Sequence, residues 1–279
     1  MADDLAVIAN TGDDVEIYGV HVSPDPDLVT YWLAGEIDHR GYGLRDDTWS
    51  VMEALEHAGR PAWFRLGDRD LAMCLVRTEL LRRGYRLTQA HAAVVDAMGV
   101  EARVLPMCDE PVRTHVRARG EWRPFQEFMI VDGARGPVEG VDLRGAADAR
   151  PTEEVLAVLA EAKAIVIGPS NPIVSIGPIL AVPGMREAVA GSPAPVVAVS
   201  PFVGGRAVKG PTEDFCAQAG IELSASGIAT AYDGLLDGVV ADERSAGVPA
   251  LVMETLMDGA DDRRRVAERT LEFAVSLTA

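Results

Sequence analysis

The sequence predicts an α/β protein built on a doubly wound, mostly parallel, Rossmann-like sheet. Short apolar runs typical of buried strands recur at residues 5–9, 164–167 and 196–199. Segments of helical periodicity occur at residues 48–58, 70–83, 88–98, 152–162 and 261–277. Strands and helices that alternate in this way favour parallel strands joined by crossover helices.

Capping residues support the predicted helices. Asp47 is among the candidate N-caps of residues 48–58, and Gly59 follows that segment as a C-terminal cap. Asp70 is the predicted N-cap of the next helix, which ends before Gly84. These boundaries leave each apolar face on one side of its helix.

The middle of the chain departs from the parallel pattern. Residues 112–118 and 122–131 alternate between apolar and polar, and a turn at Arg119-Gly120-Glu121 separates them. We therefore predict a small antiparallel excursion. The length of 279 residues fits one α/β domain over residues 1–279, with a subsidiary insertion at about 108–145.

Composition excludes several classes of function. The formal charge of −17, from 43 acidic and 26 basic residues, disfavours nucleic acids and anionic membranes as partners. A phosphate group must then be met locally, by backbone amides, a few Arg or Lys residues, or a metal ion. Three widely spaced cysteines suggest neither a disulfide framework nor a zinc site, and no export signal is visible, so we expect a cytoplasmic location.

Two polar loops follow predicted strands, where ligands bind in open parallel sheets. Gly168 to Pro178, with Ser170 and Asn171, offers hydroxyl, amide and backbone N–H groups to a diphosphate or nucleotide. Ser200 to Pro211 adds glycines and cations, including Gly204 and Lys209. The alternatives are an ordinary strand-to-helix loop and a glycine hairpin with solvated cations.

Two aspartate pairs lie near the same expected sheet edge. Asp13 and Asp14 follow the first strand, and Asp25 and Asp27 lie on a proline-containing loop shortly after. Exposed carboxylates that converge from two loops suit Mg²⁺, which bridges substrate phosphates. The alternative is that these acids simply form turns.

Five segments together resemble the 2-phospho-L-lactate transferase family (CofD/FbiA): NTGDD, SPDPD, GDRD, GPSNPIVSIGPILAVPGMRE and SPFVGGRAVKGP. The resemblance spans residues 5–242. It implies an enzyme that joins Fo, a deazaflavin alcohol, to a phospholactyl or phosphoenolpyruvyl group carried on a guanosine diphosphate conjugate. GMP leaves, Mg²⁺ is required, and the product belongs to coenzyme F-420 biosynthesis. The resemblance also implies a homodimer.

The resemblance assigns residues to roles by position. Asp14 and Asp27 become the catalytic and metal-binding carboxylates, and Arg65 lies beside Fo. Ser170, Asn171, Ser175 and Gly177 hold the guanosine phosphates. The remaining expected substrate-binding residues are Asn10, Thr11, Asp13, Asp25, Asp68, Arg69, Pro172, Ile176, Ser200, Gly204 and Lys209.

The chain departs from the family pattern at two places. Met73-Cys74 stands where the family has a Thr-His pair, and the chain begins without the strand and Gly-Gly-x-Gly-Gly loop that open family members. We expect this Gly-rich βα unit to be absent. Two further readings are a nucleotide-sugar-binding regulator of the YvcK type, which carries D-D-G-G-S-S-G where this chain has Asp13-Asp14-Val15-Glu16-Ile17, and a degenerate, non-catalytic paralogue.

Overall fold

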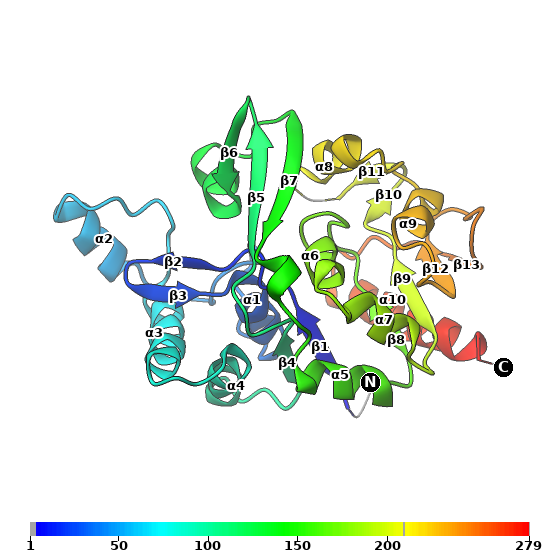
Figure 1. The fold of residues 1–279 in the computed structure, drawn as a ribbon, viewed down its shortest axis with the longest axis horizontal. Helices are drawn as coiled ribbons and strands as arrows, with labels where there is room; N and C mark the ends of the chain where they lie inside the picture. Colours follow the sequence, from blue (N-terminus) through cyan, green and yellow to red (C-terminus); the bar gives the residue numbers. More distant parts are fainter. Residues whose placement is uncertain (1–3, 209, 279) are drawn as a thin grey trace.

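Four parallel strands form the main sheet of the protein. The computed structural model describes residues 4–208 and 210–278. The strand order is β13-β12-β9-β8, with bounds β8 (Ile165–Ile167), β9 (Val196–Val199), β12 (Gly238–Ala241) and β13 (Ala250–Val252). These strands correspond to two of the predicted apolar runs and to two shorter segments farther along the chain (Figure 1).

Helices cover both faces of this sheet. They are α5 (Glu153–Glu161), α7 (Met185–Ala190), α9 (Ala225–Ala231) and α10 (Ala260–Ser276). Val196 and Ala198 of β9 join the largest apolar core with side chains of α5, α7 and α9. Val197 and Val199 point the other way and pack with side chains of α10. The alternation along β9 therefore confirms the predicted doubly wound arrangement.

A second parallel ladder carries the first strand. Its strands are β1 (Ala6–Ala9) and β4 (Arg103–Pro106), and the helices beside it are α1 (Pro24–Leu33) and α4 (Leu87–Ala97). Ala9 packs against Val95 of α4 on one face, whereas Leu105 joins the main core on the other. The predicted parallel strands thus form two ladders that share one core.

The first aspartate pair, Asp13 and Asp14, leads into a small lobe. The lobe contains β2 (Val15–Ile17), β3 (Val20–Val22), α2 (Ser50–His57) and α3 (Asp68–Arg82). The prediction that Asp70 caps α3 is wrong, because α3 begins at Asp68. Asp47 instead accepts hydrogen bonds from the backbone N–H groups of Arg69 and Asp70, at 2.9 and 3.1 Å.

The caps of α2 and α3 are exchanged. Asp68 accepts from the backbone N–H groups of Ser50 and Val51, each at 3.0 Å, and so caps α2. Each acid therefore caps the helix that the other precedes in the chain, which local sequence patterns cannot reveal.

The predicted antiparallel excursion is confirmed in part. Its strands are β5 (Arg113–Ala118), β6 (Glu121–Pro124) and β7 (Val138–Arg144), in the order β6-β5-β7 (Figure 1). The strand predicted to reach Val131 ends at Pro124, and a π-helical turn follows. Phe128 of that turn is buried edge-on against Phe215, with ring centroids 6.1 Å apart. Burial of this ring overrides the alternating pattern.

Short elements complete the chain. They are α6 (Ile176–Ala181), α8 (Thr212–Ala219) and the hairpin of β10 (Phe202–Val203) and β11 (Arg206–Ala207). Within the described residues, none of the helices has both the length and the apolar character that a bilayer crossing requires.

Thr152 offers a test of how α5 is held at its start. Its Oγ1 accepts from the backbone N–H of Val155 at 3.1 Å. We expect Thr152→Ala to lower the free energy of unfolding by about 1 kcal/mol, because the N–H loses its partner. Thr152→Ser keeps the hydroxyl and should retain most of that stability in urea unfolding. Equal losses in the two variants would show that the cap contributes nothing.

Candidate functional site

The chain after β1 forms a tight turn, residues 10–14, which we call the acid turn. Asn10 organises it: its Oδ1 accepts from the backbone N–H of Gly12 at 2.7 Å. Its Nδ2 donates to Asp25 Oδ2 at 3.1 Å and to the carbonyl of Val174 at 3.3 Å. One side chain therefore connects the turn, the start of α1 and the Ser-Asn-Pro loop.

Gly12 lets the acid turn approach the insertion closely. A Cβ atom at this position would lie 2.6 Å from Thr114 Oγ1 and 2.9 Å from Asn10 Oδ1. The backbone N–H of Thr114 also donates to the carbonyl of Gly12 at 2.7 Å. The turn and β5 are thus in direct contact.

Asp14 is held by two hydrogen bonds. Ser23 Oγ donates to its Oδ1 at 2.7 Å, and His21 Nε2 lies 2.9 Å from its Oδ2. His21 Nδ1 lies 3.0 Å from Glu16 Oε1, so both ring nitrogens face carboxylates, which accept hydrogen bonds. Burial alone lowers the pKa of His21, but the bonds to Asp14 and Glu16 outweigh it and raise the pKa to about 9.

Asp27 is buried, not exposed at the sheet edge as the sequence suggested. It lies in the first turn of α1, with 3% of its surface exposed, and Asp14 is only 4% exposed. Asp27 Oδ1 pairs with Arg77 of α3, whose side chain is fully buried. Arg77 Nη1 also donates to the carbonyl of His21 at 3.2 Å. A buried carboxylate needs such a partner to remain charged.

In Asp13 and Asp25, the surroundings disfavour the charged form of the carboxyl group. Burial raises the pKa of Asp13 well above its ordinary value, and the charges of Asp25 and Asp14 raise it further. Burial also raises the pKa of Asp25 to about 6, assisted by the charge of Asp14 and opposed by the Asn10 hydrogen bond. Like charges gathered in a buried site destabilise one another unless a cation joins them.

The donor set fits a hard divalent cation. The charge of Asp14 raises the pKa of Asp13, Asp25 and Asp27, so the four carboxylates lie near one another, and oxygen is the ligand that Mg²⁺ prefers. Among the described residues, the buried oxygens Asp13 Oδ1 and Asp27 Oδ2 have no hydrogen-bond partner. A dication would bind these unpartnered oxygens, and its charge would offset the repulsion between the carboxylates.

Among the described residues, the group of candidate ligands with metal-like spacing contains Asp27 but none of the other three acids. The Asp27 carboxylate, that of Asp70 and the thiol of Cys74 offer atoms that all lie within 4.8 Å of one another. Arg77 already supplies the positive charge at this place. Burial raises the pKa of the Cys74 thiol well above its ordinary value, which disfavours the thiolate that would bind a metal. Mg²⁺ binding at the acid turn therefore stays a prediction.

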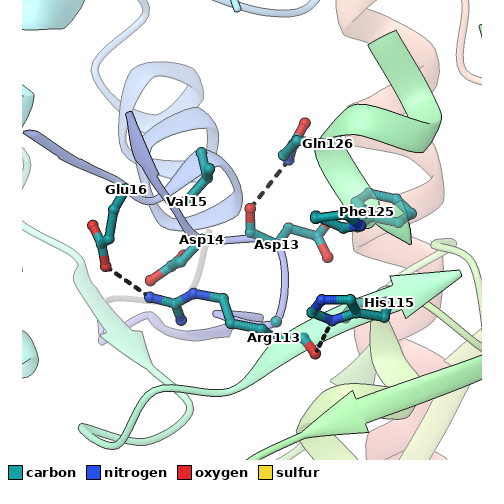
Figure 2. Close-up of a pocket in the computed structure, with 11 residues that line it drawn as sticks. Asp13, Asp14, Val15, Glu16, Arg113, His115, Phe125 and Gln126 are labelled. Carbon is teal, nitrogen blue, oxygen red and sulfur yellow. Dashed lines mark hydrogen bonds and ion pairs between the residues drawn. The ribbon is translucent and has the colours of Figure 1, made fainter. Parts of the chain in front are cut away.

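A pocket of about 190 Å³ is lined by the acid turn on one side and by the insertion on the other, beside their contact at Gly12 and Thr114 (Figure 2). Its lining is Gly12, Asp13, Asp14, Val15, Glu16, Arg113, Thr114, His115, Pro124, Phe125 and Gln126. Gln126 Nε2 donates to the carbonyl of Asp13 at 3.2 Å, and Arg113 Nη2 donates to Glu16 Oε1 at 2.9 Å. The insertion residues were not among the predicted site residues, although alternation in β5 already placed Arg113 and His115 on one face.

The Ser-Asn-Pro loop lies against the acid turn, as predicted for neighbouring sheet edges. Asn171 Oδ1 accepts from the backbone N–H groups of Ile173 and Val174, at 2.8 and 3.2 Å, so this side chain shapes the loop. Ser170 is exposed, and the N–H groups of Ser175 and Ile176 donate to the carbonyl of Asn171. Phosphate binding by this loop stays a prediction.

The carbonyl of Pro172 lies so near Gly177 that a Cβ there would be 3.0 Å away. Glycine therefore lets the loop close onto the first turn of α6 without displacing this carbonyl.

The second predicted loop is occupied by internal contacts. Ser200 is buried, and its Oγ accepts from the backbone N–H of Phe202 at 3.1 Å. The N–H of Gly204 donates to Asp242 Oδ2 at 2.6 Å. Lys209 lies outside the described residues.

Four predicted binding residues lie outside the pocket lining, and their side chains contact other parts of the protein. Arg65 pairs with Glu56 at 3.1 Å, and Asp68 caps α2. Arg69 Nη1 donates to a carbonyl of the preceding loop at 3.0 Å. Thr11 is buried, with its Oγ1 3.7 Å from Cys108 Sγ. Contacts of these residues with a substrate stay predictions.

Comparison with known proteins identifies the family. The family profile described as 2-phospho-L-lactate transferase CofD matches residues 1–270. The chain belongs to this family. A phosphoenolpyruvate transferase from Kitasatospora aureofaciens is 41% identical, over 98% of this chain and 90% of its own. A 2-phospho-L-lactate transferase from Methanosarcina mazei is 37% identical, over 95% of this chain and 90% of its own.

Solved structures agree on the fold. Protein BH3568 from Bacillus halodurans superposes with a TM-score of 0.62 at 17% identity, over 96% of this chain and 91% of that chain. At this low identity the likeness supports the α/β fold alone.

The structure locates the Met73-Cys74 pair that departs from the family pattern. Cys74 is fully buried in a small apolar core with Met52 and Leu71, beside Asp27 and Asp70. It therefore takes the place of the family histidine next to the Asp27–Arg77 pair, not at the pocket surface.

Asp25 provides a test of the electrostatics of the cluster. Its pKa of about 6 in the folded protein lies above the ordinary value of about 3.9, so the folded state binds the proton more tightly. This contribution to stability is complete below about pH 4 and is lost as the pH rises through about 6. The free energy of unfolding should therefore fall less over this range in Asp25→Asn than in the wild type. Urea unfolding at several pH values measures both slopes, and equal slopes would contradict the assignment.

Proposed function

We propose that the protein is a Mg²⁺-dependent transferase of coenzyme F-420 biosynthesis. It moves a phospholactyl or phosphoenolpyruvyl group from a guanosine diphosphate conjugate to the terminal ribityl hydroxyl of Fo and releases GMP. Membership of the family and the names of the relatives support this proposal. The observation that carries it is the gathering of four carboxylates at the end of β1, beside the Ser-Asn-Pro loop.

Positioning and charge neutralisation dominate phosphoryl transfer. Asp14 and Asp27 would hold Mg²⁺, which neutralises charge on the phosphates when bound. Ser23 and His21 fix the orientation of the Asp14 carboxylate. The attacking hydroxyl must lose its proton, and a carboxylate of the cluster is the acceptor within reach of the pocket. The homodimer and the cytoplasmic location stay predictions.

Asp14 is the better carboxylate with which to test the metal. Replacing Asp27 would leave Arg77 as an unpaired buried charge and unfold the protein for unrelated reasons. Asp14→Asn keeps an oxygen for the Ser23 hydrogen bond and removes the charge. We expect the rate of transfer to fall by more than about 100-fold, beyond what loss of an outer-shell partner costs.

The measurement is mass analysis of the deazaflavin product formed from Fo, Mg²⁺ and each guanylylated donor. Asp96→Asn, at an exposed position on α4, is the matched control and should keep its rate. Full activity of Asp14→Asn, or of the wild type in excess chelator, would remove the metal from the proposal.

Ligand-induced stabilisation distinguishes the alternatives. GDP with Mg²⁺ should raise the melting temperature, because a ligand at about 100 times its Kd stabilises the folded state by about 2.7 kcal/mol. UDP-sugars should leave the melting temperature unchanged. The opposite ranking would favour a nucleotide-sugar-binding regulator, and indifference to both would favour a non-catalytic paralogue.

A further inference from the structure

The pocket beside the acid turn carries two basic side chains that the proposed chemistry does not use. Arg113 and His115 are the basic residues among the described residues of its lining. Because alternate residues of a strand share a face, both project from β5 to the same side (Figure 2). They lie across the pocket from Asp13 and Asp14.

Both side chains can exchange their present contacts for a ligand. Arg113 donates to Glu16 Oε1 at 2.9 Å and to the carbonyl of Val112 at 2.8 Å. The Glu16 side chain is 62% exposed, so water screens this pair and it is weakly held. His115 Nδ1 lies 3.3 Å from the carbonyl of Arg113 and donates to it, so Nε2 faces the ligand. In the imidazolium form Nε2 also carries a hydrogen and donates to an anion.

The size and charge of the pocket restrict what it can hold. At about 190 Å³ it is smaller than the roughly 300–1,000 Å³ of sites that enclose a whole drug-sized ligand, so it suits one small group of a larger substrate. The protein is strongly acidic, and Asp13 and Asp14 form one wall. Arg113 and His115 are the lining side chains that can offer positive charge to a small anion here.

We propose that Arg113 and His115 bind the carboxylate of the three-carbon group that is transferred. This inference rests on the proposed function. Phospholactyl and phosphoenolpyruvyl groups both carry a carboxylate on the carbon that bears the phosphate oxygen. A phosphate held at the acid turn therefore places that carboxylate in the adjoining pocket, where a guanidinium forms charge-assisted hydrogen bonds with it. The two residues select donors that carry a carboxylate.

Equilibrium binding to the full chain with Mg²⁺ tests this assignment. The ligands are phosphoenolpyruvyl guanosine diphosphate and GDP, which lacks the three-carbon group. Arg113→Gln should raise the Kd for the conjugate by about 10-fold or more, because a charge-assisted pair is lost. The Kd for GDP should change by less than about 2-fold. His115→Asn should act in the same direction, and Arg113→Lys should restore part of the affinity.

Arg117→Gln is the matched control. Arg117 lies on the same strand, half-exposed, 3.4 Å from Glu139 and outside the pocket. The Arg117→Gln variant removes one positive charge, as Arg113→Gln does, and should bind both ligands as the wild type does. Because Arg113 is partly exposed, its variants should keep the wild-type melting temperature, which shows that they are folded.

The outcomes separate this inference from the proposed function. If the wild type binds both ligands but Arg113→Gln weakens them equally, or weakens neither, the carboxylate assignment is overturned and the transferase remains. If the wild type binds neither ligand, the proposed function fails and the assignment fails with it. A selective loss for the conjugate, absent in Arg117→Gln, supports it.

Discussion

The buried ion pair between Asp27 and Arg77 is the interaction on which the site depends. It joins α1 to α3, and Arg77 also bonds the carbonyl of His21 on β3. Three elements that surround the acid turn are thereby held at one point. Breaking such a pair leaves an uncompensated buried charge and costs about 3–5 kcal/mol. The pair therefore allows several carboxylates to be kept out of water close to one another.

Much of the fold could be predicted because local sequence patterns indicate most of its strands and helices. The runs at 164–167 and 196–199 are strands, and the predicted helices are present within a few residues of their bounds. The hairpin of β2 and β3 was missed, because three-residue strands carry too little pattern. The exchanged caps of Asp47 and Asp68 and the burial of Phe128 were also missed, since each depends on residues distant in sequence.

Part of the candidate site could also be predicted from the sequence, and part could not. The acid turn, Asp25 and the Ser-Asn-Pro loop were predicted together, and Asn10 does connect them. The exposure of the aspartates was predicted wrongly, because their turn-forming sequence gives no sign that α1 and α3 enclose Asp27. The insertion wall was missed because about a hundred residues separate Arg113 from the acid turn. Such a contact follows from tertiary packing, not from periodicity.

Gly12 and Thr114 bring the insertion and the acid turn so close that no side chain fits between them. The insertion has its own antiparallel sheet, and by that criterion it resembles an exchangeable module. The contact between Gly12 and Thr114, however, fixes the insertion against the acid turn. A side chain at position 12 would displace both Thr114 Oγ1 and Asn10 Oδ1, so a substitution there would disturb the insertion and the acid turn together. The wall of the pocket and the carboxylates that face it are therefore held in one fixed relative position.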